Sequence, residues 1–403
     1  MTPCTTALFG ENYWNQSLAV ADALRPQASV HRATLPNQVR VWVISQYDDA
    51  RAALSDPRLS KDNAGLTAII RDQLAAAGQE ADLSNMFAPH MMFNDDPAHA
   101  RLRALVAAKF TRGRVRALRP WIEQLATAVL DELPVDRPVD LIDTVAFPLP
   151  LNVICQLLGV PLDDREYLRE WTAALMEDLP ERALPASREM ERYFDRLIAA
   201  RRAVPGDDLL SALVQQSEHG DQLTPPELMG TLFLLFVAGH ETTTNLIGNT
   251  VRHLLAEPSR WRRLAADPGL VPAAIEESLR YDSPVRMATH RFTTEDVAYG
   301  GVVIPAGEIV LVWLQSANRD DNRFPRATDL VLGRADAAAH LSFGHGIHYC
   351  LGAPLGRMEA EIVLRALTQR FPDARLAASA HELQRRPSAI MNGYVGLPVR
   401  LAG

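Results

Sequence analysis

Length, composition and charge limit the class of protein. The chain has 403 residues, of which 47% are hydrophobic and 22% charged, a composition typical of a folded protein with a large core. Its formal net charge of −8 argues against nucleic acid as a partner, because phosphate binding needs an excess of clustered Lys and Arg.

The elements predicted in the first half of the chain are mostly helices. No basic start followed by an apolar block opens the sequence, so we expect no secretory signal and a cytoplasmic protein. Residues 41–45 read V-W-V-I-S, a strand that passes into a helix over residues 47–54, and Asp56 and Pro57 end that helix. Apolar residues then recur at helical spacing over residues 97–133, 162–176 and 188–203.

The second half continues with a long helix and several short strands. Residues 224–256 have helical periodicity, and their most apolar part, residues 228–239, is shorter than the roughly 20 residues that a membrane span needs. Strand character follows at residues 291–292, 297–304 and 309–313, and again near 394–401. Because no repeat or linker divides the sequence, we expect a single domain over residues 1–403, mainly α-helical with small β-sheets, and no membrane association.

Three cysteines are too few for a disulfide framework and indicate a reducing compartment. Cys4 lies near the start of the chain. Cys155 lies in the apolar run of residues 148–159, where a buried structural thiol is expected. Cys350 alone has a chemically unusual neighbourhood.

Cys350 lies in the segment F-G-H-G-I-H-Y-C-L-G, residues 343–352, directly before a helical run. Gly344 and Gly346 allow a tight turn and a close approach to a flat cofactor. The helix N-terminus that follows favours an anion and lowers the pKa of a thiol there. The pattern therefore predicts a thiolate metal ligand. A zinc site is disfavoured, since His345 and His348 have no second cysteine nearby to complete a tetrahedral set.

A polar cluster interrupts the apolar central helix at A-G-H-E-T-T-T-N, residues 238–245. Gly239 weakens a helix by about 1 kcal/mol relative to Ala, and Thr hydroxyls that bond to the preceding turn bend it. A widened turn could hold dioxygen and water. Solvated threonines are the alternative, which the preceding apolar run disfavours. The zinc-protease pattern H-E-x-x-H does not apply, because Thr244 stands where the second histidine is required.

The cysteine loop resembles the haem-binding loop of the cytochrome P-450 superfamily, F-G-x-G-x-H-x-C-x-G, at every fixed position. The resemblance spans nearly the whole chain, includes A-G-H-E-T-T, E-S-L-R-Y and A-N-R-D, and is closest to soluble actinobacterial enzymes that tailor polyketides and macrolides. It implies a single-domain fold in which haem b lies between the central helix and the cysteine loop, with Cys350 as the axial iron ligand.

The resemblance also implies roles for individual residues. Glu241 and Thr242 become the acid and alcohol that relay protons during oxygen activation, and Glu277 and Arg280 a structural clamp. A third partner of the clamp is open, because Asp329 occupies the usual basic position and either Arg326 or Arg334 could substitute. The resemblance implies three groups of cofactor contacts. Ala238 and Gly239 form an oxygen groove, and His99, Arg103, Arg291 and His348 contact the propionates. The remaining contacts are Phe343, Gly344 and Gly352.

Substrate contacts are implied in segments rich in methionine, which fills irregular apolar space. Simple core packing is the alternative for each of them. The candidate pocket residues are Met86, Phe87, Met91, Met92, Val285, Met287, Ala288 and Met391. The implied substrate is a polyketide- or macrolide-like secondary metabolite that is hydroxylated or epoxidised.

The implied partners follow from the absence of a flavin or nicotinamide module in the sequence. Electrons are expected from a ferredoxin and a ferredoxin reductase, and the enzyme is expected to be a monomer. Arg112, Arg114, Arg116 and Arg357 are expected to attract an acidic ferredoxin, although a solvated helix face is the alternative for such a patch. Two other functions stay open: oxidative coupling or desaturation on the same scaffold, and a non-catalytic haem-binding protein that needs Cys350 but neither Glu241 nor Thr242.

Overall fold

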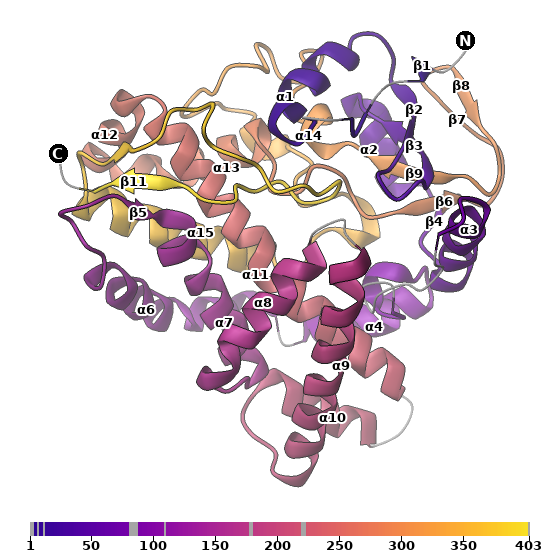
Figure 1. Ribbon diagram of the computed structural model, residues 1–403, viewed down its shortest axis with the longest axis horizontal. Helices are drawn as coiled ribbons and strands as arrows, with labels where there is room; N and C mark the ends of the chain where they lie inside the picture. The colour runs from indigo at the N-terminus through magenta and orange to yellow at the C-terminus, as the bar shows by residue number, and fades with distance from the viewer. Residues whose placement is uncertain are drawn as a thin grey trace.

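The computed structural model describes residues 4–5, 8–10, 13–79, 88–108, 110–176, 180–218 and 223–401. Helices dominate the fold and small sheets complete it, as predicted (Figure 1). The α-helices are α1 (Tyr13–Leu24), α2 (Tyr47–Ser55), α3 (Asn63–Ala76), α4 (Ala98–Ala107), α5 (Arg112–Ala117), α6 (Arg119–Asp131), α7 (Pro148–Leu158), α8 (Arg165–Met176), α9 (Pro180–Ala203), α10 (Leu209–Glu218), α11 (Pro225–Leu255), α12 (Pro258–Ala266), α13 (Val271–Tyr281), α14 (Leu314–Ala317) and α15 (Ala353–Arg370). Shorter helical turns are η2 (Met91–Phe93), η3 (Ile142–Ala146), η4 (Leu162–Asp164), η5 (Pro268–Leu270), η6 (Ala337–Ala339) and η7 (Gly346–His348).

The strands form three small sheets. They are β1 (Cys4–Thr5), β2 (Val30–Thr34), β3 (Arg40–Ile44), β4 (Leu59–Ser60), β5 (Val139–Asp140), β6 (Arg291–Thr293), β7 (Val297–Tyr299), β8 (Val302–Ile304), β9 (Ile309–Val312), β10 (Arg375–Leu376) and β11 (Pro398–Arg400). The largest sheet has the order β1-β2-β3-β9-β6-β4, and it places β6, which carries Arg291, between β9 and β4. A second sheet has the order β10-β11-β5, and β7 pairs with β8.

The long helix α11 crosses the middle of the molecule and packs against α7, α13 and α15 (Figure 1). Its start is fixed by a capping box, in which Thr224 accepts from the backbone of Glu227 and Glu227 accepts from the backbone of Thr224. Nearly the whole helix is buried, because it carries apolar side chains on all of its faces. Among the described helices, none combines the length and the hydrophobicity that a membrane span requires.

The region between residues 97 and 133 divides into α4, α5 and α6. Thr111 caps α5 by accepting a hydrogen bond from the backbone N–H of Arg114, and a proline at the start of α6 opens the next helix. Helix α5 packs against α15, so its arginines lie beside the helix that follows Cys350. The end of α4 and the start of α5 therefore determine where the arginines of α5 lie.

Candidate active site

The cysteine loop is a tight turn that ends at the start of α15. Gly344 and Gly346 have φ of 75° and 73°, the left-handed region that side chains disfavour. The backbone N–H of Cys350 donates to the carbonyl of Phe343 over 2.8 Å, which closes the loop. At Gly346 an added Cβ would lie 3.1 Å from the Cβ of Ser55 on α2. The two glycines are thus required by backbone shape, as the sequence predicted, and the second also by packing.

The Cys350 side chain is exposed at the end of this loop, with protein atoms close around the thiol. Burial of the thiol raises its pKa, while the backbone amides of Gly352 and Ala353 and the guanidinium of Arg103 lower the pKa. The helix N-terminus therefore acts in the predicted direction, but desolvation is the larger effect and the net shift is upward. Coordination to a metal would favour the thiolate further.

Helix α11 presents one partly exposed face in an otherwise buried helix. Ala238, Gly239 and Thr242 are half-buried and lie on that face, at spacings of one and four residues. The Thr242 hydroxyl donates to the Ala238 carbonyl over 2.9 Å. A Cβ on Gly239 would come within 2.7 Å of Ile154 on α7, which gives this glycine a packing role as well. The helix continues as α-helix through this turn, so the polar cluster does not interrupt it.

Glu241 is fully buried, and within the described part of the chain neither of its carboxylate oxygens has a hydrogen-bond partner. The closest cation is Arg386, whose Nη1 lies 3.5 Å from Oε1 of Glu241. Burial raises the pKa of Glu241, and Arg386 lowers the pKa. Arg386 comes from the C-terminal segment and was not predicted as a site residue, since nothing in its local sequence points to α11.

The four predicted propionate contacts come together from three parts of the chain. The rings of His99 on α4 and His348 in the cysteine loop lie 4.3 Å apart. Arg103, one turn after His99, donates to the carbonyl of Tyr349 over 2.7 Å. Burial, together with the nearby Lys61, Arg291, His99 and Arg103, lowers the pKa of His348 to about 2. Several basic side chains therefore gather around this imidazole.

Buried basic groups at this density favour an anion that balances their charge. Arg291 is 3% exposed, and burial lowers even its pKa to about 10. A haem supplies two carboxylates for such a cluster and an iron for the thiol of Cys350. The glycine loop, the thiol, the half-buried face of α11 and the cation cluster therefore fit a haem. Lys61 belongs to this cluster too, although no sequence motif points to it.

The predicted clamp of Glu277 and Arg280 is a fully buried, bidentate ion pair. Nε and Nη2 of Arg280 donate to the two carboxylate oxygens of Glu277 over 2.7 and 2.8 Å, and both side chains are 0% exposed. Arg334 is the third partner, with Nε 3.2 Å from Oε1 of Glu277. Arg326 points outward with a side chain that is 75% exposed. The alternative left open by the sequence is thus resolved in favour of Arg334.

Replacement of Glu277 tests this clamp. Glu277→Gln leaves Arg280 and Arg334 buried without a counter-charge, which we expect to lower the free energy of unfolding by about 3–5 kcal/mol. The measurement is denaturant unfolding monitored by circular dichroism. The control is Glu257→Gln, which removes an exposed partner of Arg260 and should change stability by about 1 kcal/mol or less. Equal stability of the two variants would contradict the proposed role of the pair.

The predicted substrate residues divide into three groups. Met86 and Phe87 lie outside the described residues. Met287 is 0% exposed and packs in the core with Trp313, which matches the alternative of core packing. The remaining five are partly buried, and they are Met91, Met92, Val285, Ala288 and Met391. Val285 and Met391 pair in an antiparallel bridge, and Met91 and Met391 both pack against the apolar cluster that includes α11.

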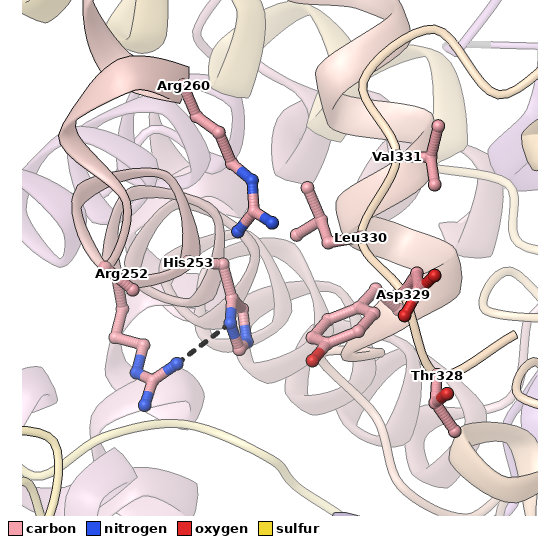
Figure 2. Close-up of a pocket in the computed structure, with 9 residues that line it drawn as sticks. Arg252, His253, Arg260, Thr328, Asp329, Leu330 and Val331 are labelled. Carbon is pink, nitrogen blue, oxygen red and sulfur yellow. Dashed lines mark hydrogen bonds between the residues drawn. The ribbon is translucent and has the colours of Figure 1, made fainter. Parts of the chain in front are cut away.

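A separate pocket of about 430 Å³ lies at the C-terminal end of α11 (Figure 2). Arg252 and Arg260 line one side, and the segment from Thr328 to Val331 lines the other. Arg252 donates to Nδ1 of His253 over 3.0 Å, and Nε2 of His253 bonds with Asp282 over 2.7 Å. Arg252 is ten residues beyond Thr242, roughly 15 Å along the helix at 1.5 Å per residue. This pocket is therefore distinct from the candidate active site.

Fold and site together define a haem-dependent oxidoreductase. The family model Cytochrome P450 matches residues 269–376. Cytochrome P450 107B1 of Saccharopolyspora erythraea is 48% identical over 92% of this chain and 92% of its own length. Polyketide biosynthesis cytochrome P450 PksS of Bacillus subtilis is 38% identical over 98% of each chain. The solved structure of the tirandamycin C-bound P450 monooxygenase TamI matches with a TM-score of 0.91 and 41% identity, over 97% of this chain and 99% of that one.

The chain belongs to the cytochrome P450 family. It is a monooxygenase, and members of this family bind haem b through a cysteine thiolate. Bacterial enzymes of this kind act on small molecules and receive electrons from a ferredoxin and its reductase. The fold, the enzyme class and the cofactor predicted from the sequence are thereby confirmed.

Proposed function

We propose that the substrate of this monooxygenase is a polyketide- or macrolide-like secondary metabolite, hydroxylated or epoxidised at an unactivated carbon. Two relatives support this class, one named for polyketide biosynthesis and one bound to tirandamycin C. The partly buried Met91, Val285 and Met391 agree with an apolar pocket that adapts to an irregular ligand.

A ligand screen on the holoenzyme tests the substrate class. A compound that enters the site shifts the main haem absorption band, so difference spectra report binding directly. Macrolides and linear polyketides should shift the band at lower concentrations than fatty acids or steroids of similar size. The reverse order would contradict the proposed class. Analysis of products then separates hydroxylation and epoxidation from coupling or desaturation.

We further propose how the chain holds the cofactor. Cys350 ligates the iron, Phe343, Gly344 and Gly352 shape the loop beside it, and His99, Arg103, Arg291 and His348 bind the carboxylates. When bound, haem supplies the dioxygen chemistry that inserts one oxygen atom into the substrate. Ala238 and Gly239 lie on the face of α11 proposed to line the oxygen site. The contribution of the protein is ligation, orientation and proton supply.

Glu241 and Thr242 are proposed to supply the protons. The observation that supports this role is the buried carboxylate of Glu241 next to a half-buried hydroxyl on the same turn of α11. Burial raises the pKa of Glu241 and Arg386 opposes that shift, so this carboxyl can both hold a proton and pass it on. A haem protein that only binds its cofactor would not need this buried acid.

The surface for the electron donor is proposed to lie over α5 and the start of α15. Arg112, Arg114 and Arg116 are exposed on α5. Arg357 is bound to Glu276 over 2.6 Å and lies over the ring of Phe343, so we propose a smaller role in docking for it than for the arginines of α5. We also propose that the whole chain folds as one catalytic domain, a monomer in the cytoplasm.

Charge reversal on α5 tests the docking surface. Arg112→Glu should slow reduction by an acidic ferredoxin several-fold at low salt and weaken the dependence on ionic strength, because rim charges steer association. The measurement is the stopped-flow rate of haem reduction over a salt series. Arg262→Glu, an exposed position whose partner is Asp373, which follows the C-terminal end of α15, is the control and should leave the rate unchanged. Identical behaviour of both variants would remove Arg112 from the docking surface.

A further inference from the structure

Lys61 is an unusual residue in this chain. The sequence contains only two lysines, Lys61 and Lys109, among 41 Lys and Arg residues. Lys61 lies between β4 and α3 and is 2% exposed. Its Nζ donates to the hydroxyl of Thr289 over 2.5 Å and lies 5.1 Å from the centre of the Phe93 ring. No carboxylate in the described part of the chain forms an ion pair with this side chain.

One cation, two imidazoles and one acid face Lys61. They are Arg291 at the start of β6, His290 just before it, His348 in the cysteine loop, and Asp95. Asp95 is already engaged, because it accepts from the hydroxyl of Ser60 and from the backbone N–H of Lys61. Burial lowers the pKa of Lys61 well below its ordinary value, Arg291 lowers the pKa further, and Asp95 opposes both.

Thr289 links Lys61 to the proposed carboxylate site. Its hydroxyl binds Lys61, and its carbonyl accepts from Nη1 of Arg291 over 3.2 Å. The two cations therefore converge on one residue, and Lys61 is buried as deeply as Arg291 and His99, at 2%, 3% and 3% exposure. A carboxylate that binds Arg291 would therefore lie in the same cluster of basic side chains as Lys61.

We propose that Lys61 is a fifth member of the carboxylate-binding site and takes up a proton from solvent when the haem propionates bind. This inference rests on the proposed haem site. Burial and the Arg291 guanidinium disfavour the charged form of the amine, and a carboxylate that adds negative charge beside it favours the ammonium. A proton is gained and no electron moves. Arginine could not act in this way, because it stays protonated at all accessible pH values.

The pH dependence of haem loss tests the proposal. Haem transfer from the holoenzyme to excess apomyoglobin is followed by absorbance over a pH series that extends into the range where lysine titrates. Wild type should lose haem faster as pH rises, because deprotonation of Lys61 removes a charge-assisted hydrogen bond. Lys61→Met should lose haem about tenfold faster at neutral pH, a change in the range of such a bond. Lys61→Arg should lose haem slowly and with a weaker pH dependence than wild type.

Two further variants separate the possible outcomes. Arg71→Met removes an exposed cation from α3 and should behave like wild type. Arg291→Met should accelerate haem loss if the cluster binds the propionates at all. Fast loss from Arg291→Met with wild-type behaviour of Lys61→Met would overturn the role of Lys61 alone. Wild-type behaviour of both would overturn the carboxylate site itself. If Lys61→Met does not fold, a pH profile of Lys61→Arg equal to wild type would overturn the proton uptake.

Discussion

Cys350→His is expected to abolish the strongly red-shifted absorption band of the reduced carbonyl complex. That shift is a property of thiolate ligation, and a neutral imidazole cannot supply the same electron density to the iron. The loop should tolerate the change better than most, since the Cys350 side chain is exposed at its end. The measurement is the reduced, carbon monoxide-bound spectrum of purified wild type and variant at equal haem content.

Cys155→Ser is the matched control for this experiment. Cys155 is fully buried on α7, and burial raises its pKa to about 12, so it is a poor ligand and a poor nucleophile. The control should keep the shifted band even if it loses some stability. A shifted band in Cys350→His, or wild-type protein that binds no haem, would show that Cys350 is not the axial ligand.

The parts of the site that depend on local sequence were predictable. Gly344, Gly346 and Cys350 lie within seven residues, and their backbone turn follows from the glycines themselves. The strand and helix near residue 45 were also predicted, and they appear as β3 and α2. In each case the pattern is contained in one segment, so no knowledge of distant contacts is needed.

The parts that depend on contacts between distant segments were not predictable in the same way. Arg334 reaches Glu277 because the chain turns at Arg326 and Gly333, with φ of 54° and 83°. The turn at a non-glycine residue has no strong sequence signal. Arg386 lies 145 positions after Glu241, and its role depends on how the C-terminal segment packs on α11.

Burial also decides which role a residue can have, and the sequence does not show burial directly. Met287 fitted the composition of an apolar pocket, yet it packs in the core with Trp313. Periodicity gives the face of a helix or strand, while burial depends on the whole fold.

Thr242→Ala is expected to separate electron flow from product formation. Haem content, the shifted carbonyl band and substrate affinity should stay as in wild type, because the Thr242 side chain is bonded only to the Ala238 carbonyl in the described structure. A positioned acid or base contributes about 10²- to 10⁴-fold to a proton-transfer step. Without the hydroxyl, most reducing equivalents should therefore be released as hydrogen peroxide instead of appearing in product.

The quantity to compare is product formed per reducing equivalent consumed, under identical ferredoxin supply. Thr243→Ala is the matched control, because Thr243 is buried on the next position of α11 and its hydroxyl lies near Gly356 of α15, away from the half-buried face. It should keep wild-type coupling. Glu241→Gln should resemble Thr242→Ala if the two act in one relay, since the amide cannot hold and release a proton. Unchanged coupling in Thr242→Ala would show that Thr242 is not part of the proton relay. The relay would then be assigned to another group, such as a hydroxyl of the substrate.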